Sequence, residues 1–233
     1  MNRIRPNITA CFAAIKAPAL YRNFFIHAFV MFPAALTMCW IATQIDSHLK
    51  VPPLPNPDFR LWIGILGIIV GGTWVWYVYG YLFLAGGGSP GTHVDGGPVR
   101  LVDTGPYSAI RHPSVLGKIL GVLSLGIAWG SQTFLLGFIP ILILYAVISN
   151  KLIQERFCHL RFGEQYAQYC EQVPMLIPSP TSLSHWKNGT SILSENLNHD
   201  VQSQPPSIWL EFRWYLLGLC LLISSFTVIW QLL

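Results

Sequence analysis

Two long apolar runs separated by only two residues constrain the fold of this chain more than any other feature. The runs cover residues 114–130 and 133–150, and Ser131 and Gln132 join them. Each run is close to the roughly 20 residues that a helix needs to cross a hydrocarbon core about 30 Å thick. The short connection predicts a helical hairpin, so the polar segments before and after it return to one membrane face.

The composition favours an integral membrane protein. Of the 233 residues, 52% are hydrophobic and only 10% are charged, whereas about 25% are charged in an average soluble domain. Five apolar stretches approach or reach the length of a membrane span. We therefore predict an all-helical membrane bundle with about five transmembrane helices, near residues 24–43, 61–84, 114–130, 132–150 and 209–232.

The placement of lysine and arginine predicts the orientation of these helices, because short cytoplasmic loops retain positive charge. Basic residues gather before the first span, after the second and after the fourth, at Arg3, Arg5, Lys16, Arg22, Arg100, Arg111, Lys151, Arg156, Arg161 and Lys187. We expect a multi-pass protein whose N-terminus and polar hairpin ends are cytoplasmic. The net charge of +4 reflects this bias and requires no nucleic-acid partner.

Changes in composition divide the chain into three parts. Residues 1–178 form the predicted membrane core, and its motif region covers 85–178. Residues 179–206 are rich in Ser, Asn, Gln and Pro, which predicts a flexible polar linker. Residues 207–233 are expected to add a C-terminal transmembrane helix. The cysteines and histidines form no ligand pattern, so no metal site is predicted.

Titratable groups lie at both polar ends of the hairpin. Arg111 and His112 precede Pro113, which suits the first turn of a helix because its missing N–H is unpaired there in any residue. Counted from the turn, His112 and Glu155 lie about 28 and 34 Å along their helices, a difference of about one helical turn. A guanidinium, an imidazole and a carboxylate can therefore meet. The alternative is that the charged groups only snorkel or pair at the interface.

These positions and their neighbours resemble the superfamily of isoprenylcysteine carboxyl methyltransferases and phospholipid methyltransferases. The resemblance covers about residues 85–178 and is carried by Gly105-Pro106-Tyr107, Arg111-His112-Pro113-Ser114, Gln154-Glu155, Phe162-Gly163, Tyr166, Tyr169 and Val173-Pro174. Two positions depart from the pattern. Relatives usually have glutamate where this chain has Gln154, and an aromatic residue where it has Val115.

The resemblance implies a methyltransferase that takes S-adenosyl-L-methionine from the cytosol and a lipid or lipidated acceptor from the bilayer. The acceptor could be a phospholipid amine, a prenylcysteine carboxylate or a smaller hydrophobic molecule. By analogy, the catalytic residues are Arg111, His112 and Glu155. The cofactor would be bound by Gly86, Gly88, Tyr107, His112, Pro113, Gln154, Glu155, Tyr166 and Tyr169. Tyr166 and Tyr169 could equally dock a short helix onto the core.

Two other functions remain open at this stage. Sterol reductases share a similar Arg-His-Pro segment and use NADPH, although they usually have more membrane helices than five. A non-catalytic membrane protein that binds lipid or a partner is the second alternative, and the departures at Gln154 and Val115 motivate it. Binding of S-adenosylhomocysteine separates the methyltransferase from both.

Overall fold

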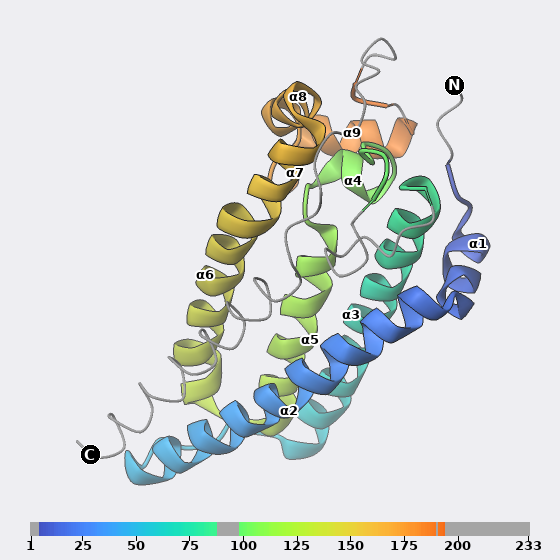
Figure 1. Ribbon diagram of the computed structural model, residues 1–233. Helices are drawn as coiled ribbons and strands as arrows, with labels where there is room; N and C mark the ends of the chain where they lie inside the picture. The colour runs from blue at the N-terminus through green and yellow to red at the C-terminus, as the bar shows by residue number, and fades with distance from the viewer. Residues whose placement is uncertain (1–4, 88–97, 190, 194–233) are drawn as a thin grey trace.

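The structure, a computed structural model, describes residues 5–87, 98–189 and 191–193, with only the backbone of residues 15 and 18–32. Every regular element within these residues is helical, as the sequence predicts (Figure 1). The N-terminal elements are α1 (Ile8–Ala13), η1 (Ala14–Lys16), α2 (Pro18–His48) and α3 (Pro57–Ala85). The later elements are α4 (Pro106–Ala109), α5 (Pro113–Trp129), η3 (Phe134–Phe138), α6 (Ile139–Ser149), η4 (Asn150–Glu155), α7 (Arg156–Phe162), α8 (Glu164–Gln172) and α9 (Pro180–Asn188).

Two helices in the described part of the chain are long and apolar enough to cross a membrane. They are α3 and the continuous helix Phe134–Phe162, each of 29 residues, and α5 is a shorter apolar helix. The continuous helix joins η3, α6, η4 and α7, and it continues beyond the predicted span 132–150. The polar residues that follow Ser149 stay helical because no proline or glycine occurs between Ser149 and Gly163. The predicted span 24–43 falls within α2, and 209–232 lies outside the described residues.

Helices α3 and α5 pack closely because glycines line their contact. A methyl group on Gly71 would lie 2.6 Å from the Gly117 carbonyl oxygen, and one on Gly117 would lie 2.8 Å from the Gly71 oxygen. Near the far end, a methyl group on Gly64 would meet the Ala128 Cβ at 2.4 Å. Small residues let helix backbones approach in this way in membrane proteins. The contact fixes the start of α5 against α3.

Asp46 holds the turn of the predicted hairpin. The Ser131 hydroxyl donates to one carboxylate oxygen at 2.5 Å, and the Thr133 hydroxyl and N–H donate to the other at 2.6 and 3.1 Å. Asp46 is itself buried. Because these bonds satisfy free donors at the start of a helix, the carboxylate ties the end of α2 to the beginning of η3.

Short helices gather at the opposite end of the bundle, where α4, α8 and α9 lie above α3, α5 and the continuous helix (Figure 1). Helix α9 begins with a reciprocal capping pair, in which the Ser179 hydroxyl accepts from the Ser182 N–H and the Ser182 hydroxyl accepts from the Ser179 N–H. Within the predicted polar linker 179–206, Pro180–Asn188 is helical. Serine and proline, which indicate a linker by composition, here supply a cap and a first helical turn.

A buried aspartate fixes the chain that follows α9. The Asp103 carboxylate accepts hydrogen bonds from the Ser191 hydroxyl at 2.7 Å and from the N–H groups of Ile192 and Leu193 at 3.1 and 2.9 Å. Asp103 is 1% exposed. Residues 191–193 are thus bound to the loop that leads into α4.

Candidate active site

The backbone around Arg111 and His112 is held in place where α5 begins. The helix starts at Pro113 with His112 as the preceding cap residue, which confirms the predicted helix start. The N–H of Arg111 donates to the Pro174 carbonyl at 2.9 Å, and the N–H of His112 donates to the Met175 carbonyl at 3.2 Å. The chain after α8 therefore pairs with the chain before α5 and fixes the direction of both side chains.

Trp74 of α3 also contacts the backbone where α5 begins. Its indole N–H donates to the Pro113 carbonyl at 2.7 Å. Its ring meets the ring of Trp186 edge to face, with centroids 5.8 Å apart. Trp186 lies on α9, which packs against α4. The start of α5 is thus enclosed by α3 and the C-terminal short helices.

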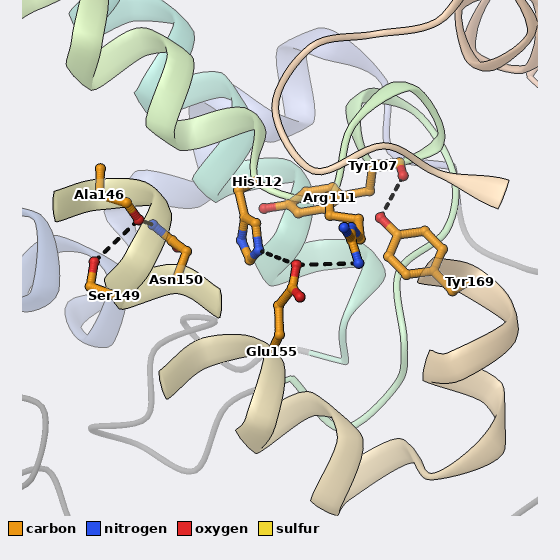
Figure 2. Close-up of polar contacts among 8 residues, drawn as sticks. All are labelled: Tyr107, Arg111, His112, Ala146, Ser149, Asn150, Glu155 and Tyr169. Atoms are coloured by element: carbon orange, nitrogen blue, oxygen red, sulfur yellow. Dashed lines mark hydrogen bonds and ion pairs between the residues drawn. The ribbon is translucent and has the colours of Figure 1, made fainter. Parts of the chain in front are cut away.

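The side chains of Arg111, His112 and Glu155 meet at one carboxylate oxygen. Glu155 Oε1 lies 3.3 Å from Arg111 Nη1 and 3.3 Å from His112 Nε2 (Figure 2). Glu155 and His112 are 7% and 8% exposed. The predicted meeting of a guanidinium, an imidazole and a carboxylate is confirmed. A charge-assisted cluster of this kind is stronger in a buried site than in water.

Arg111 keeps its positive charge although it is partly buried. Burial lowers the pKa of its guanidinium, but a hydrogen bond with Cys170 and the nearby Glu155 carboxylate raise it further, so the net shift is upward. Its Nε atom is buried and has no acceptor among the described residues. The guanidinium therefore binds Glu155 through one edge and keeps a donor for another group.

Tyr169 joins α8 to α4. Its hydroxyl donates to the Tyr107 carbonyl at 2.6 Å (Figure 2), and burial raises the pKa of the Tyr169 phenol well above its usual value. The Tyr107 ring packs in a core cluster with Val78 and Tyr81. Tyr107 thus reaches the neighbourhood of the site through its backbone. This contact supports the alternative that Tyr169 docks its helix.

Tyr166 is buried next to Tyr169 and faces His159. The Tyr166 and His159 rings lie 4.8 Å apart, edge to face. His159 contributes a favourable charge interaction to Glu155, four residues earlier on the continuous helix. Tyr166 also packs with Phe162 in the cluster that supports α8. His159 therefore links the Tyr166 ring to the Glu155 carboxylate.

The remaining predicted residues lie in different places. Gly86 ends α3, and its carbonyl accepts from the N–H groups of Val99 and Arg100 at 2.8 and 3.2 Å. Gly88 lies outside the described residues. Gln154 is half-buried in η4, directly before Glu155. A cofactor-binding role for each of these residues stays a prediction.

Asn150 is a polar residue of this region that sequence reasoning overlooks. It stands at the last position of the second apolar run, where a polar residue is taken for the end of a span. The structure buries it at 6% exposure within the helix that carries Glu155. Asn150 stands five residues before Glu155. In an α-helix this spacing does not put two residues on one face, so the sequence gives no reason to place Asn150 beside Glu155.

Two comparisons with known proteins bear on this site. Residues 59–165 match the family model described as phospholipid methyltransferase. The chain is also similar to the cobalt-zinc-cadmium resistance protein CzcN of Cupriavidus metallidurans, with 31% identity over 128 residues. That match covers 54% of this chain and 53% of the relative, so the chain spans about half the length of the curated relative it matches. No solved structure matches the chain significantly.

The fold and the site define a helical protein that carries membrane-length apolar helices and a buried Arg-His-Glu cluster at one end. The matched segment 59–165 contains Arg111, His112 and Glu155, and it ends before Tyr166. The matched family falls within the superfamily that the sequence resembles. The family match and the two apolar helices agree with membrane association.

Proposed function

We propose that this chain is a methyltransferase that uses S-adenosyl-L-methionine to methylate a lipid or lipidated acceptor at the cytoplasmic membrane face. One observation carries the proposal. Within the segment that matches phospholipid methyltransferases, two residues at the start of α5 reach Glu155 at the far end of the hairpin, both at 3.3 Å. The acceptor would be a phospholipid amine or a prenylcysteine carboxylate.

The residues present fit the cofactor. S-Adenosyl-L-methionine carries a carboxylate, an amino group and ribose hydroxyls. The buried Arg111 Nε, which no acceptor among the described residues reaches, suits the carboxylate because arginine binds carboxylates through a planar fork of donors. The Glu155 carboxylate suits the amino group or a hydroxyl, since both donate hydrogen bonds. When bound, the cofactor would supply a methyl group on a positively charged sulfur.

The chemistry required of the protein is modest. Positioning the acceptor and stabilising charge can provide most of the acceleration of a group transfer. An amine acceptor must lose a proton, and the His112 imidazole or the Glu155 carboxylate can take it. A carboxylate acceptor has no proton to lose, so it needs only orientation. The contact of His112 with Glu155 would hold the imidazole in one orientation in either case.

Charge placement supports a multi-pass chain with the site on the cytoplasmic side. Arg100, Arg111 and Lys187 belong to segments at the end of the bundle that carries α4, α8 and α9 (Figure 1). Positive residues are enriched in short cytoplasmic loops. S-Adenosyl-L-methionine from the cytosol would then reach the site directly, and a lipid acceptor would arrive between the helices.

Cofactor binding and labelled methyl transfer test the proposal. Purified full-length protein in detergent is titrated with S-adenosylhomocysteine by calorimetry. It is then incubated with radiolabelled S-adenosyl-L-methionine and either vesicles of phosphatidylethanolamine or N-acetyl-S-farnesylcysteine. We expect binding and label in one of the two acceptors, and label lost with His112→Ala. Absence of both binding and transfer would overturn the proposal, as would a thermal shift with NADPH and none with S-adenosylhomocysteine.

A further inference from the structure

The inward face of η4 carries two polar side chains, and only Glu155 is explained by the cluster at the start of α5. Asn150 and Glu155 are the two buried residues of this six-residue π-helical segment. Between them, Lys151 and Leu152 are exposed. A π-helical turn takes more residues than an α-helical turn and is frequent at functional sites. Here it turns residues five apart toward the same interior.

The Asn150 amide has one bound end and one unbound end. Its Nδ2 donates to the Ala146 carbonyl at 2.6 Å (Figure 2). Because a carbonyl only accepts, this bond fixes which end of the amide is nitrogen. The Oδ1 atom is buried, and no donor among the described residues reaches it. The residue is only 6% exposed.

An unpaired acceptor at this depth is unfavourable, since buried polar groups in proteins are paired almost without exception. The Arg111 Nε atom is a second buried polar atom without a partner among the described residues. In Figure 2, Asn150 lies on the His112 side of Glu155, and Arg111 lies on the other side. A ligand with an acceptor at one end and a donor at the other complements the pair.

We propose that Asn150 is a further binding residue of the site, whose Oδ1 accepts a hydrogen bond from an N–H or O–H group of the bound molecule. This inference rests on the proposed function and deepens it. Two sources offer that chemistry: an amino or hydroxyl group of the cofactor, and the amine of a methyl acceptor. Asn150 precedes Glu155 on the continuous helix, so it lies on the side of Glu155 nearer to the Ser131 turn.

Asn150→Leu tests the inference because leucine keeps the branched outline of the side chain and lacks the acceptor. Ser149→Ala is the matched control: the Ser149 hydroxyl also donates to the Ala146 carbonyl, at 3.2 Å, but Ser149 has no such buried acceptor. Asn150→Ser is measured beside Asn150→Leu, since it preserves a polar side chain that is too short to replace the amide. All variants are compared as full chains in detergent.

We expect the Asn150 variants to weaken one binding step about tenfold, as for a lost buried hydrogen bond, while Ser149→Ala stays near wild type. A higher Kd for S-adenosylhomocysteine would identify the cofactor as the donor. An unchanged Kd with a raised KM for the acceptor that the wild type methylates would identify the acceptor. The melting temperature of ligand-free Asn150→Leu should not fall below that of Ser149→Ala, because Oδ1 has no partner to lose.

The contrary results are distinct. If the wild type binds and methylates but the Asn150 variants match Ser149→Ala in Kd and KM, the inference is overturned and the proposed function stands. A melting temperature that falls with unchanged Kd and KM would assign Asn150 a structural role and overturn it as well. If the wild type neither binds S-adenosylhomocysteine nor transfers label, the proposed function and this inference fail together.

Discussion

His112 Nε2 and Glu155 Oε1 lie 3.3 Å apart although 43 positions separate the two residues. The contact closes the polar end of a hairpin whose other end is closed by Asp46 and Ser131, at 2.5 Å. Both helices of the hairpin are therefore fixed at both ends. This geometry holds Glu155 at the position where Arg111 also reaches it.

Glu155→Gln should abolish most methyl transfer. The amide keeps the shape of the side chain but removes the charge that Arg111 and His112 contact, so we expect labelled transfer to fall about 100-fold or more. Glu164→Gln is the control, because Glu164 is exposed on α8. Initial rates at saturating S-adenosyl-L-methionine measure the effect. Wild-type rates for Glu155→Gln would remove the carboxylate from the mechanism.

Arg111→Lys should weaken binding of S-adenosylhomocysteine about tenfold. Lysine keeps the charge, yet it cannot contact Glu155 and present a second donor in the fixed fork that arginine provides. Arg100→Lys, at an exposed position ahead of α4, controls for the change of residue type. Calorimetric titration gives both Kd values. Equal affinities for the two variants would contradict a carboxylate-binding role for the Arg111 guanidinium.

Tyr169→Phe should destabilise the protein by about 1–3 kcal/mol, because it leaves the Tyr107 carbonyl without its buried donor. Tyr166→Phe should cost less, since the Tyr166 hydroxyl interacts with the thiols of Cys158 and Cys170, which are weak partners. Denaturant unfolding in detergent compares the two variants. A larger loss for Tyr166→Phe would show that the α8 to α4 contact contributes less than the thiol contacts.

The raised pKa of Tyr169 adds a pH dependence. A phenol that is harder to ionise in the folded protein stabilises the fold fully below its unfolded pKa of about 10. That contribution is lost as the pH rises above 10. The difference in unfolding free energy between wild type and Tyr169→Phe should therefore be constant from pH 7 to 9.

Gly71→Ala and Gly72→Ala should have opposite effects. A methyl group at Gly71 would come within 2.6 Å of the Gly117 carbonyl oxygen, whereas one at Gly72 would meet nothing within 4 Å. We expect Gly71→Ala to cost about 1–3 kcal/mol by forcing α3 from α5. Gly72→Ala should gain up to about 1 kcal/mol, because alanine favours the helix over glycine. Two equally stable variants would contradict the close packing of these helices.

The sequence predicts the hairpin and the meeting of its ends because both depend on the lengths of the two apolar runs and of the turn between them. Pro113 fixes one helix start, and a constant rise per residue sets the depth of Glu155. It does not predict that the second helix continues to Phe162, since polarity ends a membrane span without ending a helix. It also misses Asn150, because a π-helical turn changes the spacing that places a residue inward.

Helix α9 was also unpredictable from composition. Ser182 is the one buried residue of this helix, and its capping serines resemble those of a loop. Helix α9 contacts Trp74 and α4, and Asp103 binds the residues after it; these partners lie far away in the sequence. Long-range partners of this kind leave no local pattern. The assignment of Tyr107 has the same difficulty, since its backbone and not its ring contacts Tyr169.

The binding of residues 191–193 by Asp103 sets an order of events during synthesis. Asp103 and the Arg111 backbone are made early, yet their partners are residues 191–193 and Pro174. The contacts of Asp103 and of the Arg111 backbone are therefore complete only after residue 193 has been synthesised.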